Sequence, residues 1–162
     1  MPLIHLSTPI AAPIGIVFDL SRNIDLHQVS TAKTGERAVA GRTSGLIEKG
    51  ETVTWRARHF GVWQHLTSKI TEMDRPLFFV DEMVKGTFRS IRHEHRFTET
   101  VGGTLMEDHF YYKSPLGLLG RAADALFLKA YMKKLLAERN QVIKQFAESK
   151  DPLYIPRPVP GS

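Results

Sequence analysis

The chain has 162 residues, with 22 lysines and arginines against 17 aspartates and glutamates, seven histidines and no cysteine. This length corresponds to one domain that buries a core without disulfides or a structural metal. Without cysteine, the chain has no disulfide framework, thiolate metal site or cysteine nucleophile. It has no apolar run near the roughly 18 residues of a membrane helix, and its start does not resemble a signal peptide. We therefore expect a cytoplasmic protein.

The N-terminal third predicts one strand and two short helices. Residues 2–10 alternate weakly between apolar and polar, as a strand does. Pro13 favours the first position of a helix, and an apolar stripe follows it. Residues 24–30 predict a second short helical piece. Residues 31–50 are punctuated by four glycines, which indicates a short strand and a mobile loop.

The middle of the chain, from Glu51 to Lys113, alternates with a period of two. The alternation is interrupted by turn residues at fairly regular spacing. Because the turns are short, neighbouring strands are expected to pair antiparallel as a meander. The predicted strands are 51–60, 62–73, 77–85, 88–98 and 104–113.

The last third predicts one long amphipathic helix and a tail. Ser114-Pro115 is a favourable helix start, and the helix is expected to end near Glu148. Its predicted apolar stripe contains Ala122, Ala125, Leu128, Met132, Leu135, Arg139, Val142 and Phe146. Such a helix needs a large apolar partner, and the sheet is the candidate. We predict a single α+β domain over residues 1–150, followed by an extended or disordered tail over 151–162, which has four prolines.

Alternation also sorts the side chains of each strand into two faces. In 51–60 the arginines occupy one face and should meet water, so Trp55 and His59 are predicted to point inward. The same logic predicts inward Ile91, His93, His95 and Phe97, and we favour inward Met106, Asp108, Phe110 and Tyr112. Strand 77–85 leaves two sets open: Phe79, Asp81 and Met83, or Val80, Glu82 and Val84.

The inner wall is therefore expected to carry histidines and a carboxylate among aromatic side chains. A buried carboxylate must be paired or protonated, and a His95–Asp108 pair on adjacent strands would satisfy both groups. Two interpretations stay open. The pair either only stabilises the interior of the sheet or helps to orient a ligand.

The His93-Glu94-His95 run is a candidate metal site. Two histidines at i and i+2 on a strand share one face about 7 Å apart, which suits Zn²⁺ or Fe²⁺. The run His93-x-His95-x-x-x-Glu99 resembles half of a cupin motif. The glycine spacing after it does not fit, the second half is missing, and a long terminal helix is not cupin architecture. We therefore predict no metal and no cofactor.

Nucleic acid and membrane partners are not favoured by the charge pattern. The stretch from Trp55 to Phe60 is basic and aromatic, but alternation places the two kinds of side chain on opposite faces, whereas a stacking platform needs both on one. The helix cations are interpreted as a solvated face with partners such as Glu138 and Glu148, rather than as a membrane contact. These cations are Lys129, Lys133, Lys134, Arg139 and Lys144.

Several segments together resemble one superfamily. They are Val53-Thr54-Trp55-Arg56-Ala57-Arg58-His59-Phe60-Gly61, Arg75-Pro76, Phe79-Val80-Asp81-Glu82-Met83-Val84-Lys85-Gly86, Arg92-His93-Glu94-His95-x-Phe97, Gly103-Thr104-x-Met106-x-Asp108, Ser114-Pro115-Leu116-Gly117 and Arg139-Asn140. From about Ile4 to Glu148 the chain is similar to the START/SRPBCC superfamily, which includes the polyketide cyclase/dehydrase group, and within it to the bacterial ligand-binding SRPBCC domain family. The resemblance implies a helix-grip fold, in which a curved antiparallel sheet of six to seven strands surrounds a long C-terminal helix. It also implies an apolar cavity between them, with its entrance near residues 31–50 and the start of the long helix.

Two functions are compatible with this pattern, because the superfamily contains both carriers and enzymes. The first is binding of a small hydrophobic or amphipathic ligand without catalysis. Trp55, Met83, Phe110 and Tyr112 would supply contact area, and His59, Asp81, His93, His95 and Asp108 would orient its polar end. The alternative is a cyclase or dehydratase that uses the His95–Asp108 pair as a general base. The oligomeric state is left open.

Overall fold

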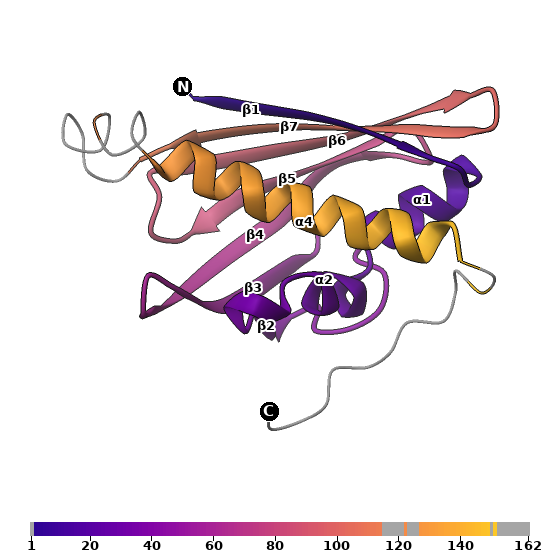
Figure 1. Ribbon diagram of the computed structural model, residues 1–162. Helices are drawn as coiled ribbons and strands as arrows, with labels where there is room; N and C mark the ends of the chain where they lie inside the picture. The colour runs from indigo at the N-terminus through magenta and orange to yellow at the C-terminus, as the bar shows by residue number, and fades with distance from the viewer. Residues whose placement is uncertain (1, 115–121, 123–126, 150, 152–162) are drawn as a thin grey trace.

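The computed structural model describes residues 2–114, 122, 127–149 and 151. Seven strands form one antiparallel sheet in the order β1-β7-β6-β5-β4-β3-β2, and α4 crosses its concave face, as does the pair α1 and α2 (Figure 1). The elements are β1 (Leu3–Ile10), α1 (Ile14–Ser21), α2 (Ile24–Ser30), the 3₁₀ turn η1 (Ala32–Thr34), β2 (Arg37–Gly41), β3 (Thr52–His59), β4 (Val62–Asp74), β5 (Phe78–Lys85), β6 (Ser90–Thr100), β7 (Gly103–Lys113) and α4 (Lys129–Ala147). The predicted α+β helix-grip architecture is confirmed.

The long helix ends where the sequence predicted: α4 stops at Ala147, and Glu148 is its C-cap residue. The predicted helix start after Ser114 and most of the Pro-rich tail lie outside the described residues. The short strand expected in the 31–50 segment is β2.

The loop between β2 and β3 is fastened to the two short helices. Arg22 donates to the carbonyl of Ile47 at 3.1 Å and to the Glu48 carboxylate at 3.0 Å. The Gly45 amide donates to Asp25 at 3.0 Å. These contacts hold the β2–β3 loop against the end of α1 and the start of α2.

The curvature of the sheet comes from its long strands and from bulges in β5, at Val84, and in β4, at Thr71. The β4–β5 register shifts between Thr67 and Ser68, and again between Ile70 and Glu72. An extra residue in one strand bends it and increases the local twist. The bent sheet thus wraps around α4 without closing into a barrel.

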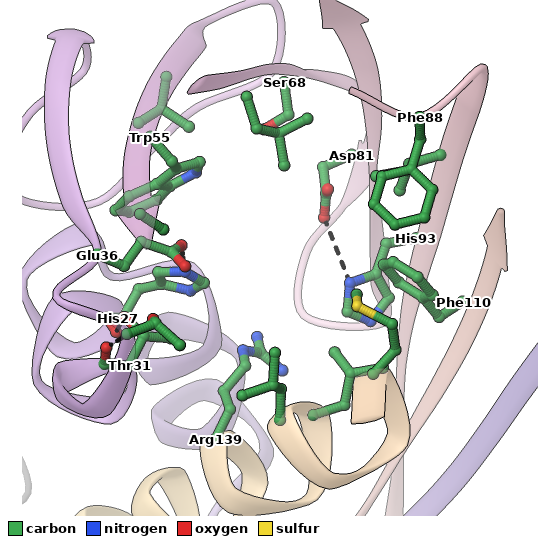
Figure 2. A pocket seen from close by; sticks show the side chains of 18 of the residues that line it. His27, Thr31, Glu36, Trp55, Ser68, Asp81, Phe88, His93, Phe110 and Arg139 are labelled. Carbon is green, nitrogen blue, oxygen red and sulfur yellow. Dashed lines mark hydrogen bonds and ion pairs between the residues drawn. The ribbon is translucent and has the colours of Figure 1, made fainter. Parts of the chain in front are cut away.

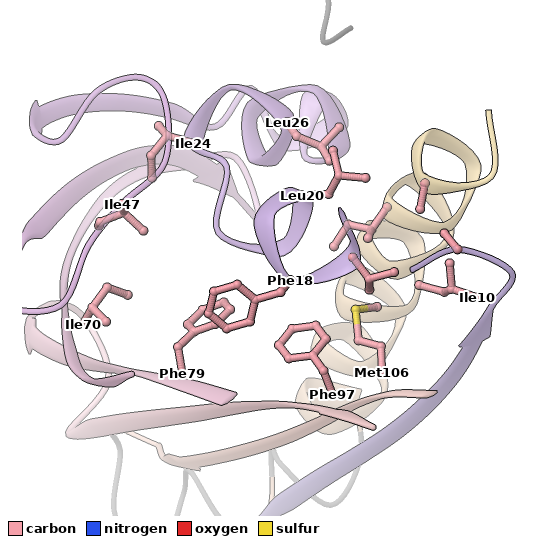
Figure 3. Close-up of a cluster of buried hydrophobic side chains, with 14 of the residues drawn as sticks. Ile10, Phe18, Leu20, Ile24, Leu26, Ile47, Ile70, Phe79, Phe97 and Met106 are labelled. Carbon is pink, nitrogen blue, oxygen red and sulfur yellow. The ribbon is translucent and has the colours of Figure 1, made fainter. Parts of the chain in front are cut away.

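The apolar core is divided into two clusters at opposite ends of the concave face. In the larger cluster the ring of Phe18 packs edge-on against Phe79, at 5.6 Å between centroids, and against Phe97, at 5.4 Å (Figure 3). The smaller cluster consists of Ile4, Ile91, Phe110, Tyr112 and Leu136. The division leaves room for polar side chains in the middle.

The buried stripe of α4 is rotated by about one residue from the predicted one. Its buried residues are Leu136, Arg139, Asn140, Ile143 and Ala147, whereas Leu135, Val142 and Phe146 are only partly buried and Ala122 is exposed. The predicted Ala125 lies outside the described residues. The reason is that α4 contacts β1, α1 and α2 at once, so its packed face is wider than a single row.

Phe18, which is not one of the residues that line the cavity described below, gives a test of the larger cluster. We expect Phe18→Ala to lower the free energy of unfolding by about 3–5 kcal/mol, since it removes a buried ring and leaves a void. Urea unfolding measures the effect. Val101→Ala, in the fully exposed β6–β7 turn, is the matched control and should change stability by less than about 0.5 kcal/mol. Equal losses in both variants would contradict this account of the core.

Candidate functional site

A cavity of about 700 Å³ lies between the concave face of the sheet and α4 (Figure 2). Its wall is formed by parts of α1, α2, β3, β4, β5, β6, β7 and α4, which bring residues from Ser21 to Arg139 together. Most of the lining area is apolar. The apolar side chains include Ile24, Ile47, Val53, Trp55, Leu66, Ile70, Phe79, Phe88, Ile91, Phe110, Met132 and Leu136.

The predicted inward faces of three strands are confirmed. Val53, Trp55, Ala57, Ile91, His93, His95, Phe97, Met106, Asp108, Phe110 and Tyr112 are all buried, and His59 is half-buried on the same wall. The choice left open in β5 is also resolved. Phe79 and Asp81 line the cavity, while Glu82 pairs with Arg92 at 2.9 Å on the other face. Val80 is buried as well, so burial alone does not distinguish the two faces.

A layer of polar side chains crosses the interior between the two apolar clusters. Each contributing element places polar residues between a residue of one cluster and a residue of the other. We call this group the polar layer: Asp81 of β5, His93 and His95 of β6, Asp108 of β7, and Arg139 and Asn140 of α4.

Asp108 is the centre of the polar layer and is fully buried. His93 Nε2 lies 2.8 Å from its Oδ1, and the Asn140 side-chain amide donates to its Oδ2 at 2.6 Å. Arg139 approaches Oδ1 at 3.5 Å and also donates to Asn140 and to the carbonyl of Ser21. A buried carboxylate is tolerated when it is paired and hydrogen-bonded, and Asp108 has partners on both the sheet and the helix.

The predicted His95–Asp108 pair is present only as a close contact. His95 lies directly opposite Asp108 in the sheet register, with Nδ1 3.2 Å from Oδ1, but this nitrogen has no hydrogen-bond partner. The hydrogen bond of His95 goes instead from Nε2 to Asp81 Oδ2, at 2.8 Å. His93, the diagonal neighbour, makes the hydrogen bond to Asp108, because diagonal side chains in an antiparallel pair are within reach of each other.

The two imidazoles are held between aromatic rings. Phe79 stacks on His95 at 4.1 Å, His95 and His93 lie 3.7 Å apart, and Phe110 meets His93 edge-on at 5.2 Å. This packing fixes the planes of both rings. Their nitrogen atoms therefore point in defined directions.

The electrostatics of the polar layer keep its carboxylates ionised and His93 neutral. Burial and then the charge of His95 lower the pKa of His93 to about 4. Burial alone raises the pKa of Asp108, but the imidazole contacts and Arg139 outweigh it and hold that pKa well below 3.8. The pKa of Asp81 is likewise lowered, since contacts with His95, His93 and Arg139 outweigh its burial.

A second polar group faces the layer across the cavity. His27 Nε2 lies 2.5 Å from Glu36 Oε1, and the His27 ring packs against Trp55 at 4.2 Å. His59 Nδ1 lies 2.8 Å from the Tyr131 hydroxyl. Burial lowers the pKa of His59, although Glu36 opposes that shift. These contacts place the Tyr131 hydroxyl and the Glu36 carboxylate at the end of the cavity near α2 and β3.

Some of the site residues predicted from the sequence line the cavity, and others lie behind its wall. Trp55, His59, Asp81, His93, His95 and Phe110 line the cavity. Three predicted residues, Asp108, Met83 and Tyr112, are not among the described residues that line the cavity. Asp108 lies behind the two histidines, and Met83 and Tyr112 pack in the smaller cluster. Sequence reasoning did not select His27, Glu36, Tyr131 or Arg139. No alternation pattern marks them, because they come from helices and from the segment before β2.

Arg139 is the clearest correction. It was counted among the solvated helix cations, but it is buried and lies 3.5 Å from Asp108. Its place in the predicted apolar stripe was the correct indication, since a cation there needs a buried counter-ion. The expected solvent-facing role fits Lys144, which pairs with Glu148 at 2.5 Å, and Glu138 pairs with Lys33.

Asp81, His93 and His95 bring potential metal ligands together. One ligand atom from each lies within 4.8 Å of the other two. The sequence prediction of no metal rested on the mismatch with the cupin motif and its architecture, not on residues of the neighbouring strands. Asp81 is on the neighbouring strand, where it pairs with His93 in the register.

Comparison with known proteins identifies the fold. A scan of protein-family models found no match, and a search of the curated proteins found none either. Among solved structures, the chain is similar to TTHA0849 from Thermus thermophilus, with a TM-score of 0.71, 18% identity, and coverage of 91% of this chain and 100% of that one. It is also similar to ginseng major latex-like protein 151 from Panax ginseng, with a TM-score of 0.68, 15% identity, and coverage of 91% and 98%.

A third similar structure is the di-domain ARO/CYC StfQ from the steffimycin biosynthetic pathway. The TM-score is 0.72 at 13% identity, and the match covers 90% of this chain but 50% of StfQ. The chain thus has the helix-grip fold that the resemblance to SRPBCC proteins predicted. In the described part of the chain, none of the helices has the length and apolar character needed to cross a membrane.

The central role of Asp108 can be tested by removing its charge. We expect Asp108→Asn to lower the free energy of unfolding by about 3–5 kcal/mol, because Arg139 would remain buried without a counter-ion. Glu107→Gln is the control on the next residue of β7. Glu107 faces outward, 3.4 Å from His5, and its loss should cost less than about 1 kcal/mol. Urea unfolding of both variants decides, and similar losses would refute the assignment.

Proposed function

We propose that this protein binds a small hydrophobic or amphipathic molecule in the cavity between the sheet and α4. The observation that carries the proposal is the cavity itself, which has a volume of about 700 Å³ and a largely apolar lining with polar groups at defined points. Ligand sites of proteins are typically clefts of about 300–1,000 Å³ with this character. A core that only stabilises the fold is close-packed and leaves few such spaces.

The lining favours a ligand with a flat apolar body and a polar end. Trp55 lies on one side of the cavity and Phe110 on the opposite side (Figure 2), and both rings line it. Asp81 and the two histidines of β6 lie between them and supply hydrogen-bond partners. The polar end of the ligand is therefore proposed to contact the polar layer.

The proposed route of entry lies beside the N-terminal part of α4. Phe60, at the β3–β4 turn, is 63% exposed, and Phe127 is 53% exposed. Their rings contact each other at 6.0 Å, and both line the cavity. Exposed aromatic rings at this place would receive an apolar ligand before it enters, which agrees with the entrance expected near the start of the long helix.

A cavity-filling substitution tests the proposal. Ala57 is buried, lines the cavity and faces α4 from β3, so Ala57→Phe should occupy the space a ligand needs. With anilinonaphthalene sulfonate as the probe, we expect fluorescence enhancement by the parent protein and at least about 10-fold weaker binding by Ala57→Phe, equivalent to about 1.4 kcal/mol.

The matched control is Arg58→Phe, which adds the same ring to the exposed face of β3. It should bind the probe like the parent. Near-UV circular dichroism confirms that each variant is folded. Equal probe affinity in the parent and Ala57→Phe would reject the cavity as the binding site. Native mass spectrometry of protein purified from its own host then gives the mass of any bound molecule.

The polar layer also favours a second candidate, an enzyme of the cyclase or dehydratase type. His95 Nε2 contacts Asp81 Oδ2 at 2.8 Å on the cavity wall, so the imidazole orients a carboxylate that can act as the general base toward the cavity. Asp81 replaces Asp108 as the partner in this proposal. StfQ, one of the similar structures, is described as an ARO/CYC protein.

Loss of water from a panel of aromatic β-hydroxyketones, followed by mass spectrometry, tests this candidate. His95→Gln and Asp81→Asn should each reduce the rate by about 100-fold or more, in the range typical of general acid–base groups. Arg58→Phe should keep the parent rate. Turnover at the parent rate in both polar-layer variants would eliminate the enzymatic alternative while leaving ligand binding intact.

A further inference from the structure

Three side chains of the polar layer direct potential metal-binding atoms toward one point on the cavity wall. Asp81 Oδ2 lies 2.8 Å from His95 Nε2 and 3.9 Å from His93 Nδ1, and the three ligand atoms are all within 4.8 Å of one another. They come from adjacent strands, β5 and β6. Figure 2 shows Asp81 and His93 facing each other at one side of the cavity.

We propose that Asp81, His93 and His95 bind a divalent transition-metal ion of the Zn²⁺ or Fe²⁺ class. Bonds of about 2.0–2.2 Å to such an ion separate neighbouring ligand atoms by roughly 3–3.5 Å. The Asp81–His95 separation already matches this spacing, and small side-chain rotations bring His93 into it. The ion would share the wall of the cavity described above, and its binding does not depend on the proposed ligand.

The chemistry of the ligand atoms sets the class of ion. Two imidazoles and one carboxylate suit Zn²⁺ and Fe²⁺, and on non-haem iron such a triad leaves coordination positions open. Ca²⁺ and Mg²⁺ prefer a shell made of oxygen atoms. Because all three residues line the cavity, the open positions of such an ion would face the space in which a small molecule would lie.

Asp108 supplies the outer partner that metal-binding histidines need. The nitrogen of each ring that faces away from Asp81 lies near the same carboxylate oxygen: His93 Nε2 at 2.8 Å and His95 Nδ1 at 3.2 Å. Metal-binding histidines usually donate their other N–H to such a carboxylate, which fixes the tautomer and orients the ring. Asn140, at 2.6 Å, holds Asp108 in turn.

His95 carries a second, independent indication. Its Nδ1 is buried without a hydrogen-bond partner, although a carboxylate oxygen lies close to each of its ring nitrogens. A neutral imidazole has one N–H and cannot donate to both. A metal ion on Nε2 would resolve this, since the proton would then sit on Nδ1, which faces Asp108 at 3.2 Å.

The local charge also favours a cation. Asp81 and Asp108 contribute two negative charges, and Arg139 contributes one positive charge at 3.5 Å from Asp108. These three side-chain charges sum to minus one. A divalent ion changes this to plus one, so its open positions would attract an anionic oxygen atom.

Cobalt titration tests the site in the untagged, EDTA-treated, full-length chain. We expect one equivalent of Co²⁺ to bind with visible d–d absorption, and Zn²⁺ but not Mg²⁺ to displace it. A cysteine-free chain gives no thiolate-to-cobalt band. Asp81→Asn should weaken binding by at least about 100-fold, since losing even an outer partner typically costs about 10–100-fold. His95→Gln should do the same.

The control is His109→Gln, because His5 and His109 stack at 4.5 Å on the outer face beside Glu107 and offer an alternative surface site. It should bind Co²⁺ like the parent. Circular dichroism monitors folding, and Zn²⁺ should raise the Tm of the parent but not of Asp81→Asn. No Co²⁺ binding, binding unaffected by both polar-layer variants, or binding lost in His109→Gln would each overturn the proposal. Binding of anilinonaphthalene sulfonate in the presence of EDTA tests the ligand cavity without any metal ion. The metal site and the ligand-binding function can therefore fail independently of each other.

Discussion

The interior of this protein depends on one buried carboxylate and its partners. Asp108 lies on the inner face of β7, where a charge without partners would destabilise the fold strongly. His93 of the sheet and Asn140 of α4 both bind it, and Arg139 supplies a counter-charge. These partners come from different layers, so the hydrogen bonds and the ion pair of Asp108 form only when the helix lies in one position over the sheet. An apolar contact alone would permit sliding, since hydrophobic burial is not directional.

This arrangement also explains why the core is not continuous. The polar layer separates two apolar clusters, and the side chains that face Asp81 from α2 and β3 do not reach across to it. The space left over is the cavity. The aromatic packing around His93 and His95 then keeps polar atoms fixed at its wall. A rigid polar group beside an apolar space is the combination from which both binding and acid–base chemistry are built.

Much of the site could be predicted from strand alternation, because a period of two decides which side chains point inward. Trp55, His93 and Asp108 were assigned correctly on that basis alone. Alternation failed to decide β5, where Phe79 and Val80 are both buried. It also gave no information on His27 and Glu36, whose segments have no strand period. The predicted partner of His95, Asp108, lies 3.2 Å from it, but the hydrogen bond of His95 goes to Asp81, because side chains reach diagonally as well as directly across the sheet.

The succession of strands, the long C-terminal helix and the inward face of β3, β6 and β7 follow from local periodicity in the sequence. Only the tertiary structure decided which polar groups meet. Asp81 and His93 are 12 positions apart in the chain, and Arg139 is separated from Asp108 by 31 positions. Their distances depend on sheet register, on bulges and on the rotation of α4 about its axis. Those quantities result from packing of the whole chain, and no local pattern encodes them.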